Sequence, residues 1–179
     1  MPKRAVIIID MLQDFVHGSL KFEGSEKIIE PIAKLLDHAR ANKWPVIYSN
    51  DAHIEGDREF EVWGPHALAG SKEAEVIEEL KPQKGDYIIP KRRYSGFFGT
   101  DLDTLLREHG IDTVILTGLH THICVRHTAA DAFFRGYKLK IPEDGVNSFT
   151  EKDHTEGLEY LKQIYNAKII TSNELLKAS

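Results

Sequence analysis

The sequence has a single cysteine, no long apolar run and no extended basic cluster. Cys124 has no second cysteine with which to form a disulfide within the chain, so it is either a free thiol that fills space or a reactive one. No segment approaches the ~18 consecutive apolar residues of a membrane span, and the apolar start of the chain is too short for a signal peptide. We therefore expect a cytoplasmic protein that has no membrane partner.

The balance of charges argues against a second class of partner. The chain of 179 residues carries a formal net charge of -5, and its short run Lys91-Arg92-Arg93 is too small to form a binding arm for nucleic acid. Its 41% hydrophobic and 28% charged residues are typical of an ordinary globular protein. We expect one domain that spans residues 1–179.

Six short runs rich in β-branched residues predict strands that are buried on both faces. They are residues 5–9, 46–48, 87–89, 113–116, 137–141 and 168–170. The spacing of apolar residues predicts helices at 25–42, 100–109, 121–135, 154–165 and 172–177. Strands that alternate with helices indicate an α/β fold of three layers (αβα), in which helices cover both faces of a central parallel sheet of about six strands.

Chemically active side chains follow the predicted strands. Asp10 follows the first, Asp51 and His53 follow the second, Lys91 follows the third, and Cys124 lies just beyond the fourth. The carboxyl ends of parallel strands meet at one edge of the sheet. We therefore expect these groups to converge on a single site.

Cys124 lies near the predicted start of a helix that Thr121 would cap. The positive end of the helix dipole and the ammonium of Lys91 would lower the pKa of the thiol and favour the reactive thiolate. Asp10 could accept the thiol proton and pass it on. The alternative is that Asp10 caps a loop and that Lys91 is a solvated surface residue.

A second group has the residue types that bind transition metals. Asp51 and His53 stand two residues apart, His66 follows in the next loop, and Glu59 lies between them. Two imidazoles with one or two carboxylates suit Zn²⁺, Fe²⁺ or Mn²⁺. The spacing alone is not specific, because the chain has nine histidines.

Five segments carry motifs that occur together in one family. They are VIIIDMLQDF (6–15), NDAH (50–53), WGPH (63–66), KRRYSGF (91–97) and GLHTHICV (118–125). With these segments in this order, the chain resembles the isochorismatase-like cysteine hydrolases, and within them the nicotinamidases, over nearly its whole length. The resemblance implies the isochorismatase-like hydrolase fold.

The resemblance also implies a role for each matching position. Three residues match the catalytic triad, namely Asp10, Lys91 and Cys124. Four match metal ligands, the last of them a ligand found in some bacterial members: Asp51, His53, His66 and Glu59. Two match aromatic residues that flank a pyridine ring: Phe15 and Trp63. The bond Leu119–His120 matches a cis peptide that shapes an oxyanion hole, although relatives more often have a small residue at the position of His120.

The favoured function is a metal-dependent amidase that hydrolyses nicotinamide to nicotinate and ammonia through a Cys124 thioester. The resemblance implies one divalent ion (zinc first, iron or manganese as alternatives), a small-molecule amide substrate and a homo-oligomer. One alternative is a related cysteine amidase that acts on another small amide or an N-carbamoyl compound, commonly without the metal ligands. Another is a catalytically silent binding protein of the same fold. Metal content distinguishes the first alternative, and the reactivity of Cys124 distinguishes the second.

Overall fold

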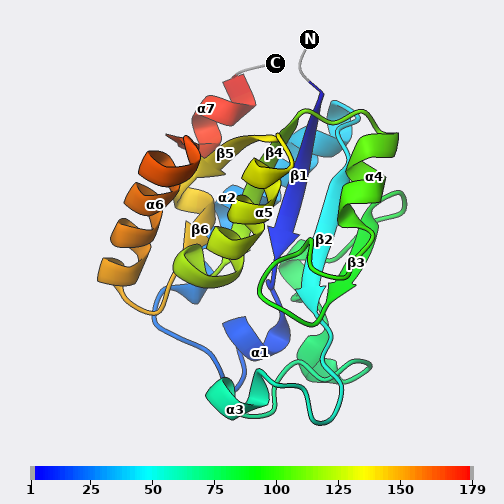
Figure 1. Ribbon diagram of the computed structural model, residues 1–179, viewed down its shortest axis with the longest axis vertical. Coiled ribbons are helices and arrows are strands. Elements are labelled where there is room, and N and C mark those ends of the chain that lie inside the picture. The colour runs from blue at the N-terminus through cyan, green and yellow to red at the C-terminus, as the bar shows by residue number, and fades with distance from the viewer. Residues whose placement is uncertain (1–2, 178–179) are drawn as a thin grey trace.

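The protein has a parallel sheet between two layers of helices (Figure 1). The computed structural model describes residues 3–177. Six strands follow one another in the order β3-β2-β1-β4-β5-β7, and a short seventh strand, β6, pairs with β4. The strands are β1 (Arg4–Ile9), β2 (Val46–Asp51), β3 (Tyr87–Lys91), β4 (Thr113–Leu119), β5 (Lys138–Pro142), β6 (Val146–Asn147) and β7 (Lys168–Ile170). The predicted α/β architecture with about six parallel strands is confirmed.

The central strands β1 and β4 are buried because both faces of the sheet are covered. Side chains of β1 alternate between the two cores: Val6 and Ile8 belong to the apolar cluster on one face, and Ile7 and Ile9 belong to the cluster on the other. A continuous apolar run therefore forms a strand that fills both cores, as expected for a parallel sheet.

Helices cover both faces of the sheet. Their bounds are α1 (Gln13–Val16), α2 (Ile29–Ala41), α3 (Phe60–Trp63), α4 (Leu102–Glu108), α5 (Arg126–Phe134), α6 (Glu151–Tyr165) and α7 (Ser172–Lys177). Helices α2 and α7 join one core through Leu35 and Leu175, whereas α4 and α6 join the other through Leu106 and Leu161. The short helices α1 and α3 lie beyond the carboxyl ends of β1 and β2 (Figure 1). None of the helices among residues 3–177 is long and apolar enough to cross a membrane.

The largest local difference from the predicted elements lies after β4. The predicted helix at 121–135 begins as a π-helical turn, Thr121–Val125, and only then continues as α5. The prediction that Thr121 is an N-cap is wrong, because its hydroxyl pairs with Nδ1 of His154 at 2.9 Å instead of with the backbone of the turn. Cys124 therefore lies in a π-helical turn and not in the first turn of an α-helix.

The strands β2 and β4 and the helix α6 are also longer than predicted. Strand β2 continues to Asp51 and β4 continues to Leu119, so both strands carry their last residues directly into the site. Helix α6 begins at Glu151 because the hydroxyl of Thr150 accepts a hydrogen bond from the N–H of Asp153.

Candidate active site

The carboxyl ends of four neighbouring strands bring the cysteine together with two carboxylates and an ammonium. Asp10 follows β1, Asp51 ends β2, Lys91 ends β3, and Cys124 lies just after β4. The Lys91 Nζ atom lies 2.8 Å from Oδ2 of Asp10 and 2.5 Å from Oδ1 of Asp51. It also lies 3.6 Å from Sγ of Cys124. All four residues are buried. The structure therefore brings the predicted triad together in one group away from water. The catalytic roles of the three residues remain a proposal.

The thiol of Cys124 does not have the lowered pKa that we expected from a helix start and the ammonium of Lys91. Burial raises its pKa well above the usual range, although the adjacent Lys91 acts in the opposite direction. The carboxylates of Asp10 and Asp51 add to the upward shift. Removal of the sulfur from water thus disfavours the thiolate more than one ammonium favours it. The cysteine keeps its proton at rest.

Asp10 is suited to take that proton. Burial and the charge of Asp51 raise the pKa of Asp10 to about 6, against the opposing effect of Lys91. Burial would also raise the pKa of Asp51, but Lys91 and His53 reverse that shift and hold it below its ordinary value. Carboxylate oxygens of Asp10 and Asp51 and the sulfur of Cys124 lie within 4.8 Å of one another. A carboxyl group with a pKa near neutrality, beside a protonated thiol, can act as a general base and acid.

Two imidazoles and two carboxylates form a buried cluster beside this group. Ligand-type atoms of Asp51, His53, Glu59 and His66 lie within 4.8 Å of one another. Ligands that are 2.0–2.2 Å from one ion are at most about 4.4 Å apart, so small inward shifts bring all four atoms to a single ion. Burial and the charge of Asp51 also raise the pKa of Glu59 to about 7, a repulsion that a bound cation relieves. The four residues fit a divalent metal ion.

Hydrogen bonds orient both imidazoles for this purpose. Nδ1 of His66 lies 2.8 Å from the carbonyl oxygen of Gly64, and Nδ1 of His53 lies 3.0 Å from Oδ2 of Asp57. A carbonyl or a carboxylate oxygen only accepts, so Nδ1 carries a proton in each ring, and Nε2 is the nitrogen left to bind a metal ion. Within residues 3–177, Nε2 of His53 has no hydrogen-bond partner. This is the tautomer that a metal ligand requires.

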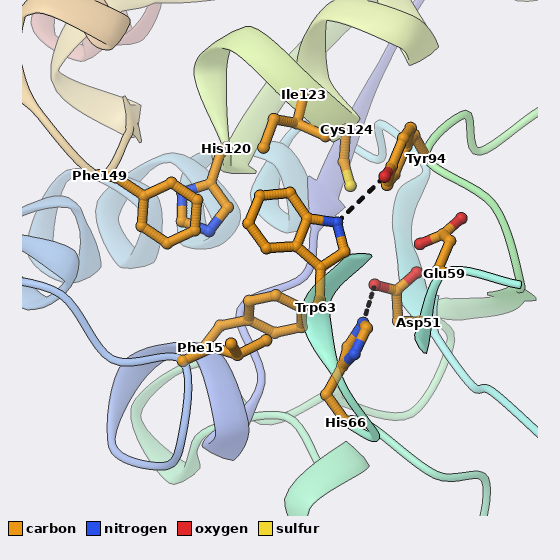
Figure 2. Close-up of a pocket in the computed structure, with 11 residues that line it drawn as sticks. Phe15, Asp51, Glu59, Trp63, His66, Tyr94, His120, Ile123, Cys124 and Phe149 are labelled. Carbon is orange, nitrogen blue, oxygen red and sulfur yellow. Dashed lines mark hydrogen bonds and ion pairs between the residues drawn. The ribbon is translucent and has the colours of Figure 1, made fainter. Parts of the chain in front are cut away.

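A pocket lined largely by aromatic side chains opens onto the cysteine (Figure 2). Its free volume is only about 20 Å³, enough for little more than one water molecule as the side chains stand. Trp63 lines the pocket, where its indole N–H donates to the Tyr94 hydroxyl at 3.0 Å and its ring stacks on Phe149 with centroids 5.7 Å apart. Phe15 lies edge-on to the ring of His120. Phe15 and Trp63 thus line the pocket, and their contact with a substrate ring stays a prediction.

The peptide bond between Leu119 and His120 is cis. It lies at the end of β4, directly before the turn that carries Cys124. The side chain of His120 is 3% exposed and stacks on Phe149 with ring centroids 4.0 Å apart. The role of this segment in an oxyanion hole stays a prediction.

Three residues of the site escaped the sequence-based predictions. Tyr94 holds Trp63, Phe149 stacks on Trp63, and Asp57 holds His53. Tyr94 belongs to the motif KRRYSGF, and Asp57 follows His53 by four residues, so both had a local signal. Phe149 had none, because it follows β6, a strand of two residues that no periodicity reveals.

Comparisons with known proteins agree with this geometry. Residues 4–174 match the model of the isochorismatase domain. The N-carbamoylsarcosine amidase of Thermoplasma acidophilum is 41% identical, with a TM-score of 0.91 over 96% of this chain and 97% of that chain. A nicotinamidase from Bacillus subtilis is 33% identical, with a TM-score of 0.89 over 93% and 98% of the two chains. A pyrazinamidase of Pyrococcus horikoshii, solved in complex with zinc, is 29% identical, with a TM-score of 0.89 over 95% and 99%.

The family assignment rests on the extent of these matches and on the site that they cover. The family model spans nearly the whole chain and includes Asp10, Lys91 and Cys124. The relative that is 41% identical is matched over almost its full length. The chain therefore belongs to the isochorismatase family, as one of its cysteine hydrolases.

Proposed function

We propose that this hydrolase is a metal-dependent nicotinamidase, which converts nicotinamide and water to nicotinate and ammonia. The observation that carries the proposal is the cluster of Asp51, His53, Glu59 and His66, which shares Asp51 with the group around Cys124. The pocket is thus lined by Cys124, a nucleophile for an amide carbon, and by residues of a cluster that suits a divalent ion. The similarity to a nicotinamidase and to a pyrazinamidase solved with zinc supports the same reading.

The first half of the reaction forms a thioester. Sγ of Cys124 attacks the carboxamide carbon while its proton passes to the carboxylate of Asp10. The carbon–nitrogen bond then breaks, and Asp10 returns that proton to the departing nitrogen, which leaves as ammonia. Lys91, which lies beside all the reacting groups, stabilises the sulfur as its negative charge develops.

The second half restores the cysteine. A water molecule attacks the thioester carbon while Asp10 accepts one of its protons. The carbon–sulfur bond breaks, Asp10 returns its proton to Sγ of Cys124, and the carboxylic acid gives its own proton to ammonia or water and leaves as nicotinate. In both halves, the backbone N–H groups of His120 and Cys124 would hold the negative charge on the carbonyl oxygen.

The metal cluster and the aromatic rings would orient the substrate. Asp51, His53, Glu59 and His66 would hold a divalent ion, and that ion supplies a Lewis acid suited to a pyridine nitrogen or a water molecule. Phe15 and Trp63 would contact the ring of the substrate and exclude water, where each aromatic contact contributes about 0.5–1.5 kcal/mol beyond area burial.

Ammonia release from nicotinamide tests the proposal. Zinc-loaded protein should release ammonia, a chelator should remove most of the activity, and added zinc should restore it. Cys124→Ala should release none while it still binds zinc. Failure to hydrolyse nicotinamide with zinc, iron or manganese would rule out this function.

A second candidate is an amidase for N-carbamoyl compounds, because the N-carbamoylsarcosine amidase is the more similar relative, at 41% against 33% for the nicotinamidase. The same attack by Cys124 would cleave a ureido carbon–nitrogen bond. Hydrolysis of N-carbamoylsarcosine that is indifferent to chelators, without hydrolysis of nicotinamide, is the result that favours this candidate.

A further inference from the structure

His120 is a buried imidazole whose two ring nitrogens lack a hydrogen-bond partner among the residues that the structure describes. Its side chain lines the same pocket as Cys124. No other histidine within residues 3–177 has both nitrogens buried and unpartnered. The neighbouring His122, for example, pairs through Nδ1 with Oγ of Ser148 at 2.6 Å. Buried polar atoms without a partner destabilise a fold and are uncommon, so this ring points to a missing partner.

A bound metal ion does not supply that partner. The unpartnered atoms of His53 and Glu59 belong to the metal cluster, where an ion would satisfy them. Figure 2 shows His120 and Phe149 on one side of the Trp63 indole, with Glu59 on the other side. The nitrogens of His120 therefore belong to a different part of the pocket wall.

The surroundings of His120 determine what it can offer a ligand. Phe149 stacks on the ring, and the rings of Phe22 and Phe15 have centroids 5.0 and 6.0 Å from it. Burial in this apolar cage lowers the pKa of His120 to about 3, so the ring is neutral near pH 7. A neutral imidazole has one N–H donor and one acceptor lone pair.

We propose that His120 is a specificity-determining residue that hydrogen-bonds a neutral polar group of the substrate, separate from the amide that Cys124 attacks. A neutral group fits better than an anion, because no lysine or arginine is among the described residues that line the pocket. The nearest buried ammonium, Lys91, is already held between two carboxylates.

This inference rests on the proposed function only in placing the scissile amide at Cys124. It names the class of substrate as small neutral amides that carry a further hydroxyl, carbonyl or amide group. Nicotinamide has no such group once its amide lies at Cys124 and its ring nitrogen lies at the metal cluster. An amide with one more polar group is therefore the better substrate.

Two pairs of compounds of nearly equal shape test the role of His120. One pair is 5-hydroxynicotinamide and 5-methylnicotinamide, and the other is malonamide and isovaleramide. The polar member of at least one pair should have the higher kcat/KM, by about tenfold or more, as expected for one hydrogen bond. His120→Phe keeps an aromatic ring against Phe149 but removes both nitrogens, so the ratio within that pair should fall to about one.

Binding of the same four compounds to Cys124→Ala, with and without His120→Phe, gives a second readout that does not need turnover. His38→Phe is the matched control: His38 also has a buried unpartnered nitrogen, but it packs edge-on to Trp44 outside the pocket. The control should leave every ratio unchanged.

The outcomes separate this proposal from the proposed function. Three outcomes would overturn the role of His120. They are equal kcat/KM and equal binding within both pairs, a ratio within a pair that His120→Phe leaves unaltered, and no binding of any of the four compounds. A preference in the aliphatic pair that His120→Phe abolishes, with no hydrolysis of nicotinamide itself, supports the role of His120 and refutes the nicotinamidase. Hydrolysis of both nicotinamides at equal rates, with no preference in the aliphatic pair, refutes the role of His120 and supports the nicotinamidase.

Discussion

Cys124 keeps its proton at rest, so its attack depends on Asp10. Oδ1 of Asp10 accepts the N–H of Asp51 at 2.8 Å, and Asp10→Asn would keep this acceptor while it removes the base. We expect Asp10→Asn and Cys124→Ala each to lower kcat by ~10³-fold or more, with the double variant no slower than either single variant, because the two groups act as a unit. Ammonia release is the measurement, and thermal melting checks that the fold is retained. Additive losses would contradict this coupling.

Asp57 holds the ring of His53 from the side opposite to the metal cluster. It accepts from Nδ1 of His53 at 3.0 Å and also pairs with Arg92. Asp57→Asn should weaken zinc binding by about 10- to 100-fold, measured by competition with a chromophoric chelator, because such partners fix the ring of a metal ligand. Asp86→Asn is the matched control, since Asp86 pairs with Arg40 at 2.7 Å outside the cluster. Equal zinc affinities of the two variants would refute the positioning role.

The neutral ring of His120 predicts a specific loss of stability in acid. Burial and the nearby His122 lower its pKa to about 3 in the folded protein, against an ordinary value of 6.5. Above pH 6.5 the ring is neutral in both states. Below it, the unfolded chain takes up a proton that the folded chain excludes, so the free energy of unfolding falls as the pH falls towards 3. From pH 7 to pH 5 the wild type should lose about 2 kcal/mol more than His120→Phe in urea denaturation, and equal losses would contradict the assignment.

At the residue scale, sequence reasoning succeeds where position in the chain determines position in space. Asp10 and Lys91 stand at strand ends, so their convergence follows from the parallel sheet alone. The protonation of Cys124 does not follow in this way, because the pKa depends on burial by side chains from distant segments. The unpartnered state of His120 likewise becomes visible only when Phe149 and the other rings around it are placed.

Strands β1 and β4 approach so closely that Gly118 has no space for a side chain. Its φ is +100°, and an added Cβ would lie 1.9 Å from the carbonyl oxygen of Ile9. Gly118→Ala should lower the free energy of unfolding by about 3 kcal/mol or more in urea denaturation, because backbone atoms must move. Ile9 and Gly118 are partners in the register of β1 and β4, so this position joins the strand that precedes Asp10 to the strand that leads to Cys124.

Gly85→Ala is the matched control for the Gly118 variant. Gly85 has a φ of +101°, and no heavy atom lies within 4 Å of an added Cβ. The Gly85→Ala variant should therefore lose only the ~1–2 kcal/mol of unfolding free energy that an unfavourable backbone conformation costs. Similar losses for the two variants would show that backbone conformation, and not the approach of Ile9, sets the effect.

At the element scale, the long apolar patterns were predictable and the short elements were not. The run in β1 identifies a strand because it fills two cores at once. Helices α1 and α3 have four residues each, too few to form by local propensity. Packing of Phe15 and Val16, which are buried, stabilises α1. The π-helical turn Thr121–Val125 also depends on tertiary partners, among them His154 of α6. The site is built mainly from these short elements, which is why its details were less predictable than the sheet.

At the scale of the whole molecule, the metal cluster links β2 to the loop that contains α3. Asp51 ends β2, whereas Glu59 and His66 flank α3, a helix of four residues with no buried side chain of its own. Three carboxylates, Asp10, Asp51 and Glu59, lie near a single buried ammonium, that of Lys91. This region has an excess of negative charge, so a divalent cation should stabilise the entire fold. The expected homo-oligomer stays a prediction and is separate from this argument.

The linkage between metal and folding gives a measurable prediction. A ligand at a concentration of about 100 times its Kd stabilises the folded state by about 2.7 kcal/mol, which corresponds to a rise in Tm of roughly 5–10 °C for a chain of this size. Zinc should produce such a rise in metal-free protein, and His53→Ala should abolish it, because one ligand is lost and the remaining carboxylates repel one another. His38→Ala, on α2, should retain the full shift. If zinc, manganese and iron all leave the Tm of the wild type unchanged, the four residues are not a metal site, and the negative charge at the strand ends serves the chemistry of Cys124 alone.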